Sequence, residues 1–205
     1  MKYIFCAGAP GSKWSSLIKN IYYSASVDRS DYSETRTYYH DAPGTMQLMH
    51  LGAYFDPGME FDLPADLGTL SKEELERRFD EPFSGQGVRI IKSHIFAHNI
   101  DILKALWPES PVILAHRTDD ACLGWWVKCG HFNITYPSYA KYYKDLRTMA
   151  HIIAAQNADI KQAWDRYPGR MPINNHTLAY ILGIEEPVEE YFQDYNKSDI
   201  GVKVI

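Results

Sequence analysis

The chain has 205 residues, of which 45% are hydrophobic and 23% are charged, and its formal net charge is −5. This length and composition suit a single globular domain over residues 1–205. The excess of negative charge argues against broad binding to nucleic acid or to an anionic membrane, so any anion site must be local.

No stretch is long and apolar enough to span a bilayer, and the apolar start over residues 1–9 is too short for a secretory signal. Three cysteines and eight histidines follow no metal-ligand or disulfide-framework spacing. We expect Cys6, Cys122 and Cys129 to be small side chains of a reducing compartment. The sequence thus predicts a soluble, cytoplasmic protein without a metal site.

The first predicted element is a buried strand over residues 2–7, followed by a glycine-rich turn and a helix whose apolar spacing is clear over residues 17–22. This order of elements holds an anionic group, because free backbone N–H groups and the positive end of the helix dipole point at it. An unliganded Pro-Gly turn is the alternative. The candidate anion-binding residues are Pro10, Gly11, Ser12, Lys13, Trp14, Ser15 and Ser16.

The position of the lysine separates this turn from a nucleotide-kinase P-loop. The Walker pattern places a lysine six residues after its first glycine and follows it directly with Ser or Thr. Here Lys13 comes five residues after Gly8 and precedes Trp14. The turn therefore predicts a phosphate cradle more strongly than a site for ATP and magnesium.

The region over residues 22–66 has little periodicity and many Tyr, Ser, Asp and Gly residues. Its aromatic residues could line an acceptor pocket, although such side chains also pack over the edge of a core. The candidates are Tyr38, Tyr39, His40, Tyr54 and Phe55. Further on, Ser71 and Glu74 fit a capping box that opens a helix through Phe79.

An apolar run over residues 88–91 ends in Lys92, Ser93 and His94. Because side chains alternate along a strand, Lys92 and His94 should point to the same side, which brings a cation and a base together. In open α/β sheets, ligands bind beyond the carboxyl ends of the strands, where this pair would lie. Two solvated side chains at a surface strand end are the alternative interpretation.

A third strand, over residues 111–116, ends at Arg117, and Thr118 can cap the helix that follows. Arg117 is placed to hold a phosphate through two parallel hydrogen bonds. An ion pair with Asp119 or Asp120 is the competing interpretation.

The remaining pattern predicts helices near residues 100–106, along 139–167, and before Gly183, where Asn174 or Asn175 can act as the cap. Strands that alternate with helices indicate a three-layer α/β/α domain with a central parallel sheet.

These three segments resemble the motifs of the sulfotransferases that use 3′-phosphoadenosine 5′-phosphosulfate (PAPS), in particular the cytosolic branch. Residues 10–15 lie over that family's Pro-Lys-Ser-Gly-Thr-Thr loop, and residues 91–94 are similar to its strand ending in Lys-Thr-His. Residues 116–120 look like its strand ending in Arg-Asn-Pro-Lys-Asp, and residues 178–184 look like its late helix. The resemblance implies the P-loop-containing nucleotide-hydrolase-like fold of this family.

The resemblance also implies a function, namely transfer of a sulfuryl group from PAPS to a hydroxyl or amine of a small molecule or carbohydrate. His94 would be the general base, while Lys92 and Lys13 would stabilise the transferring group and the leaving phosphate. Arg117 would hold the 3′-phosphate, and the product would be 3′,5′-adenosine bisphosphate. A P-loop nucleotide or small-molecule kinase and a catalytically degenerate binding protein are the alternatives.

The sequence departs from the family pattern at three places. Gly11 stands where the family carries its loop lysine, and Trp125 stands where a serine completes the 3′-phosphate site. The family's late Arg-Lys-Gly segment, which covers the nucleotide, has no counterpart.

Overall fold

The computed structural model of the protein describes residues 1–32, 39–42, 45–48, 53–59, 61–128, 142–186 and 199–205. Its elements, in chain order, are β1 (Tyr3–Gly8), α1 (Trp14–Tyr22), β2 (Tyr39–Ala42), β3 (Thr45–Leu48), η2 (Leu67–Thr69), α2 (Lys72–Asp80), β4 (Arg89–Lys92), η3 (His94–Asn99), α3 (Ile100–Leu106), β5 (Val112–His116), α4 (Asp119–Lys128), α6 (Leu146–Arg166), α7 (Asn175–Leu182) and β6 (Gly201–Val204).

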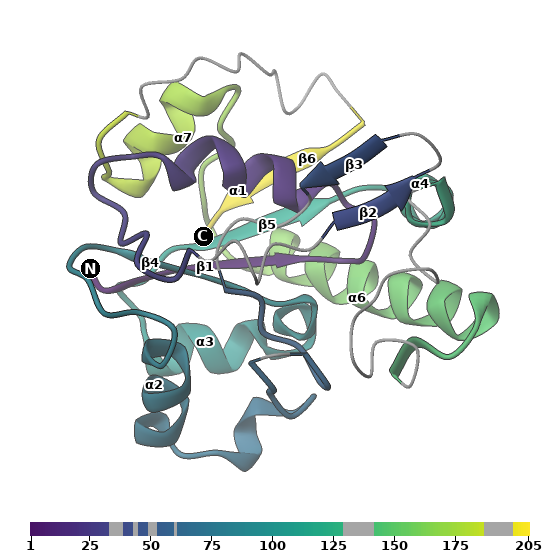
Figure 1. Cartoon of the computed structure of the whole chain (residues 1–205), viewed down its shortest axis with the longest axis horizontal. Helices are drawn as coiled ribbons and strands as arrows, with labels where there is room; N and C mark the ends of the chain where they lie inside the picture. Colours follow the sequence, from purple (N-terminus) through teal and green to yellow (C-terminus); the bar gives the residue numbers. More distant parts are fainter. Residues whose placement is uncertain (33–38, 43–44, 49–52, 60, 129–141, 187–198) are drawn as a thin grey trace.

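The central sheet has the strand order β4-β1-β5-β6 (Figure 1). β1 pairs in parallel with β4 on one side and with β5 on the other, which confirms the predicted α/β class and the parallel arrangement of these three strands. β6 lies antiparallel to β5, so the sheet is mixed and not wholly parallel as expected. β2 and β3 pair with each other in antiparallel fashion and form a separate two-stranded sheet.

Helices cover both faces of this sheet, with α1 and α7 on one side and α2, α3 and α6 on the other (Figure 1). Every residue of β1 is buried, and its side chains alternate between the two faces. Ile4 and Cys6 pack in the cluster on the α1 side, whereas Phe5 and Ala7 pack in the opposite cluster. Burial on both faces explains why the strand is a continuous apolar run without polar alternation.

Two predicted helix starts are present as expected. The Ser71 hydroxyl accepts a hydrogen bond from the Glu74 amide at 3.2 Å, and Asn174 caps α7 in a reciprocal box with Thr177. The helix expected from residue 139 is described only from residue 142 and begins at Leu146. Asp145 caps it, and Lys144 just before the cap has a left-handed φ of 54°, which interrupts any continuous helix.

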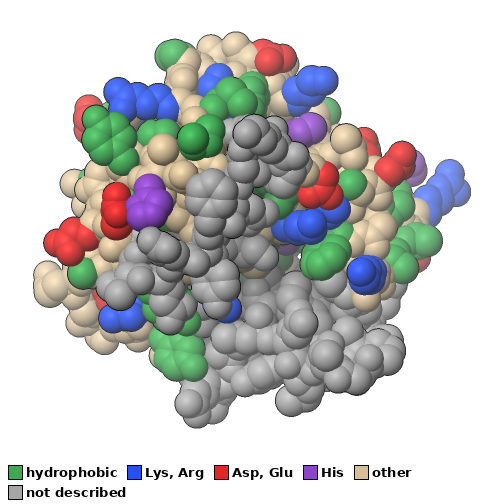
Figure 2. All heavy atoms as spheres, turned by 90° about the horizontal axis from the view of Figure 1, so that it is seen from above, with side chains coloured by type: hydrophobic (Ala, Val, Ile, Leu, Met, Phe, Trp, Pro, Cys, Tyr) green, Lys and Arg blue, Asp and Glu red, His purple; other side chains and the backbone are tan. Residues whose placement is uncertain are grey.

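Figure 2 shows a face on which lysine and arginine side chains are scattered among acidic and apolar ones, as far as the described residues go. The longest described helix, α6, carries charged side chains along its length. Within the described ranges, none of the helices has the length and apolar character needed to cross a membrane.

Candidate functional site

Three strand ends meet at one edge of the sheet, where the sequence analysis places its candidate residues. The central strand β1 ends at Gly8, which lies in register with Ala115 of β5, while Cys6 lies in register with Lys92 of β4. Since the three strands are parallel, the segments that follow them emerge on the same side. The turn after β1, the pair Lys92 and His94, and Arg117 therefore surround one edge.

The turn after β1 is closed tightly by α4. The Ser12 amide donates to the Ala9 carbonyl at 3.0 Å, and Gly11 adopts a left-handed φ of 81°. A Cβ atom on Gly11 would lie 2.0 Å from the carbonyl oxygen of Cys122 in α4. This close approach explains why glycine occupies the position at which the sulfotransferase pattern carries a lysine, because no side chain can be accommodated there.

The start of α1 leaves backbone donors without a cap from its own side chains. Lys13 occupies the N-cap position in a left-handed conformation, with φ of 63°, and makes no side-chain cap hydrogen bond. A lysine side chain can only donate, so it cannot satisfy these N–H groups. Ser12 is fully buried, and its hydroxyl has no hydrogen-bond partner among the described residues. The uncapped amides and this hydroxyl together are suited to an external anionic acceptor.

His94 lies directly against this turn. Its Nδ1 is 2.5 Å from the Gly8 carbonyl oxygen, and its ring stacks on Trp14 with 4.2 Å between centroids. Because a carbonyl can only accept, Nδ1 carries the proton and Nε2 is the nitrogen with a free lone pair. Tyr54 packs edge-on against the same imidazole at 5.6 Å. The site therefore fixes both the tautomer and the plane of the ring.

Burial controls the charge of both predicted catalytic groups of this strand end. Burial lowers the pKa of His94 to about 3, and the nearby charge of Lys92 contributes, although the hydrogen bond to Gly8 raises it. Burial likewise lowers the pKa of Lys92 to about 8, although the charge of Asp31 raises it. Lys92 and His94 are only 1% and 4% exposed. The imidazole is thus neutral at physiological pH, and both side chains are shielded from solvent.

Asp56 is a buried carboxylate that the sequence analysis does not identify. Its Oδ1 accepts hydrogen bonds from the Ser93 hydroxyl at 2.8 Å, from the His94 amide at 3.1 Å and from the Ile95 amide at 3.3 Å. It therefore caps η3 at the point where His94 begins this helix. Burial raises the pKa of Asp56 to about 7, although hydrogen bonds from Tyr54, Ser93 and the two backbone amides lower it.

Arg117 does form an ion pair, but with a partner that neither sequence interpretation named. Its Nε donates to Oδ2 of Asp199 at 2.8 Å, and its second terminal nitrogen also contacts that oxygen. The remaining terminal nitrogen donates to the carbonyl oxygens of Gly11 at 3.1 Å and Ala121 at 2.9 Å. Lys13 also reaches Asp199, at 3.4 Å. The ion pair of the competing interpretation is therefore formed, with Asp199 just before β6 as the partner in place of Asp119 or Asp120.

The other candidate residues divide between the site and the core. Pro10 is buried in the turn, and Ser15 lies in the first turn of α1. Ser16 also belongs to α1, but its side chain lies outside the described residues. Tyr54 is at the site, whereas Phe55 packs on the opposite face of the sheet.

Other candidates fall partly outside the described ranges. Tyr38 and Cys129 lie outside them, and Tyr39 and His40 belong to β2. Within these ranges, the His, Cys, Asp and Glu side chains form no group that could hold a metal ion.

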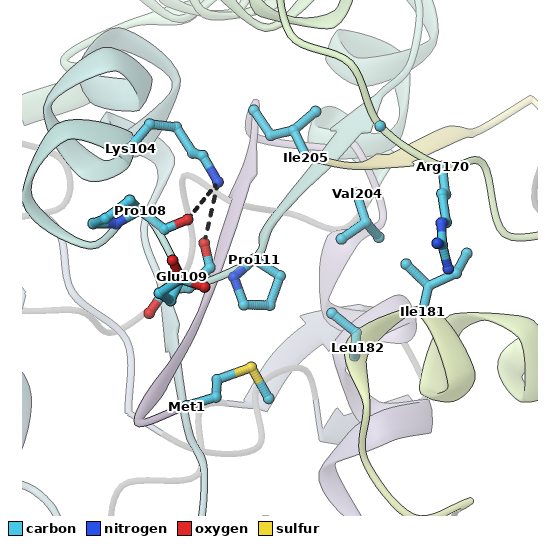
Figure 3. A pocket seen from close by; sticks show the side chains of 12 residues that line it. Met1, Lys104, Pro108, Glu109, Pro111, Arg170, Ile181, Leu182, Val204 and Ile205 are labelled. Atoms are coloured by element: carbon cyan, nitrogen blue, oxygen red, sulfur yellow. Dashed lines mark hydrogen bonds between the residues drawn. The ribbon is translucent and has the colours of Figure 1, made fainter.

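A separate hollow of about 340 Å³ lies at the opposite edge of the sheet, beside the start of β1 and the end of β6 (Figure 3). Lys104, Glu109 and Arg170 are its charged lining residues. The Lys104 amine contacts the carbonyl oxygens of Pro108 and Ser110, each at 3.4 Å. The amine is therefore already directed at backbone acceptors, and this hollow is distinct from the edge that carries His94.

Comparison with known proteins gives no match: no family model, no curated protein and no solved structure corresponds to this chain. The function therefore has to be inferred from the geometry of the site and from the motifs alone.

Proposed function

We propose that this protein is a PAPS-dependent sulfotransferase with the P-loop-like α/β/α fold of that family, in which His94 is the general base toward a hydroxyl or amine acceptor. The observation that carries the proposal is the contact between the His94 Nδ1 and the Gly8 carbonyl at 2.5 Å. It holds a base, in the tautomer that can accept a proton at Nε2, against a glycine turn that precedes the start of α1.

The turn fits the 5′-phosphosulfate of such a donor. The buried Ser12 hydroxyl lacks a partner within the described chain, and the first amides of α1 lack a side-chain cap. The Ser12 hydroxyl favours an acceptor from outside the protein, because an unsatisfied buried donor costs free energy, and the positive end of the α1 dipole favours an anionic acceptor. When bound, PAPS supplies an electrophilic sulfur and a phosphate leaving group.

The charges around the turn suit the transfer of an anionic group. The helix amides and Lys13 provide positive potential near the turn, and Lys92 is a buried amine at the end of the neighbouring strand β4. The low pKa of His94, about 3, keeps Nε2 unprotonated before the acceptor arrives. Negative charge that develops beside the ring then favours proton uptake by the imidazole.

The 3′-phosphate does not fit Arg117 while the ion pair is formed. Asp199 occupies the Nε edge of the guanidinium, and two carbonyl oxygens occupy the opposite nitrogen. This arrangement and the 4% exposure of His94 favour one alternative, a sulfotransferase-like protein that binds a nucleotide without turnover. The kinase alternative rests on the shared strand, turn and helix, and the position of Lys13 argues against it.

The experiment compares turnover and ligand binding in two histidine variants. His94→Asn keeps a side-chain N–H near the position of Nδ1, facing Gly8, but has no nitrogen in place of Nε2. We expect it to lose sulfuryl transfer from PAPS to a panel of alcohols, phenols and amines, while 3′,5′-adenosine bisphosphate still raises the melting temperature. His151→Asn, on the exposed face of α6, is the matched control and should behave as the wild type.

Ligand at a hundred times its Kd stabilises a fold by about 2.7 kcal/mol, which thermal unfolding detects readily. Full turnover by His94→Asn would eliminate His94 as the base. Stabilisation by the bisphosphate without turnover in the wild type would support the binding-only alternative, and stabilisation by ATP with magnesium alone would support the kinase. Absence of any stabilisation would refute the proposed nucleotide site.

A further inference from the structure

Three cations from different elements surround one aromatic ring beside the turn. The Lys13 amine lies 4.9 Å from the centroid of the Trp125 indole, the Lys128 amine 5.6 Å and the Arg117 guanidinium carbon 5.9 Å. Each contact is favourable for a cation over an indole face. The three positive charges nevertheless repel one another, so the cluster attracts an anion.

The chain supplies that anion itself, through Asp199. One carboxylate oxygen accepts from two nitrogens of Arg117, and the other lies 3.4 Å from the Lys13 amine. Burial would raise the pKa of Asp199, but Arg117 and Lys13 lower it, so the group is a carboxylate. The Arg117 side chain is 8% exposed, whereas that of Asp199 is 48% exposed. The Arg117 guanidinium is therefore buried in the fold, whereas the Asp199 carboxylate is accessible to solvent.

We propose that Asp199 is a specificity-determining residue, whose carboxylate occupies the place of a ligand phosphate and yields it only to a doubly charged phosphate group. This inference rests on the proposed function. Guanidinium binds carboxylate and phosphate through the same pair of parallel N–H donors, so the two anions compete for one edge of Arg117.

The geometry allows this exchange without moving the arginine. Arg117 is anchored through its other terminal nitrogen, which donates to the Gly11 and Ala121 carbonyl oxygens at 3.1 Å and 2.9 Å. Departure of Asp199 therefore leaves the Nε edge in place and open. A nucleotide with a free hydroxyl at this position would bring no charge to displace the carboxylate, whereas a nucleoside bisphosphate would.

The test measures binding of 3′,5′-adenosine bisphosphate and 5′-AMP by titration calorimetry in the wild type, Asp199→Asn and Asp165→Asn. Asp199→Asn should bind the bisphosphate about tenfold more tightly, since the competing charge is gone, and should gain much less affinity for 5′-AMP, which brings no phosphate to Arg117 and responds only through Lys13. Asp165→Asn removes one charge from the exposed face of α6 and should leave both affinities unchanged.

A folded Asp199→Asn protein that binds the bisphosphate no more tightly than a binding-competent wild type would overturn the inference and leave the proposed function standing. Failure of all three proteins to bind either nucleotide would overturn both. If Asp199→Asn does not fold, hydrogen exchange in the wild type tests the inference instead. Bound bisphosphate should accelerate exchange at residues 200–202, and unchanged exchange there would overturn the inference.

Discussion

Replacement of Gly11 by alanine is the most demanding test of the turn that forms the candidate site. Gly11 has φ of 81°, and an added Cβ would lie 2.0 Å from the carbonyl oxygen, 2.7 Å from the carbonyl carbon and 3.0 Å from the Cα of Cys122. All three atoms belong to the backbone of α4, so no side-chain rotation can relieve the contact. Either the turn or the helix must move.

Two costs determine how much unfolding free energy Gly11→Ala loses: the left-handed backbone and the added volume. A residue with a Cβ in the left-handed region costs about 1–2 kcal/mol. Forcing extra volume into a packed site adds roughly 1–3 kcal/mol. The expected loss of unfolding free energy for Gly11→Ala is therefore roughly 2–5 kcal/mol, a large share of the about 5–15 kcal/mol that stabilises a typical domain.

Urea unfolding at constant temperature measures this loss, and Gly124 provides the control. Gly124 lies within α4, and a Cβ added there would meet no atom within 4 Å. Gly124→Ala should therefore stabilise the protein by about 0.5–1 kcal/mol through the helix propensity of alanine. If Gly11→Ala unfolds within about 0.5 kcal/mol of the wild type, the packing of α4 on the turn is wrong, and the reason given for the missing lysine is wrong with it.

Two further predictions concern the buried polar groups. Ser12→Ala should raise the unfolding free energy of the unliganded protein by about 1 kcal/mol, because it removes a buried hydroxyl without a partner, and should weaken bisphosphate binding. A destabilised Ser12→Ala in urea unfolding would mean that the hydroxyl is satisfied. Burial raises the pKa of Asp56 from its ordinary value near 3.8 to about 7, so its stabilising contribution is complete below about pH 4 and is lost as pH rises through 7. Asp56→Asn should therefore gain stability over the wild type by a few kcal/mol, about 1.4 per pKa unit, between pH 4 and pH 8. An unchanged difference between the two proteins across that range would contradict the raised pKa.

Local patterns in the sequence were sufficient for the elements that position the site. Each of the three strands can be recognised from neighbouring residues alone. They are the apolar run before Gly8, the alternating run that ends at Lys92 and the strand before Arg117. They therefore predicted three parallel strands whose ends meet at one edge. The shared side of Lys92 and His94 also follows, since Lys92 pairs beside Cys6 and His94 stacks on Trp14, both on the α1 side of the sheet.

Contacts between distant segments account for what was missed. Asp56 and Asp199 follow no motif, and their roles arise only because folding brings them to Ser93 and to Arg117. The reason for Gly11 lies in α4, far along the chain. β6 has a local signal, since the buried Val202 and Val204 alternate with half-buried neighbours, but so short a segment is recognisable only beside β5.

The strand order also determines when the central strand β1 can pair during synthesis of the chain. β1 is made first, yet both of its hydrogen-bonding neighbours come much later, because Tyr3 pairs with Arg89 and Phe5 with Val112. Until those residues leave the ribosome, an entirely apolar strand has no edge to join. Such non-local pairing slows folding and leaves the nascent chain open to aggregation. The apolar strand therefore stays unpaired until the segments that carry β4 and β5 have been made.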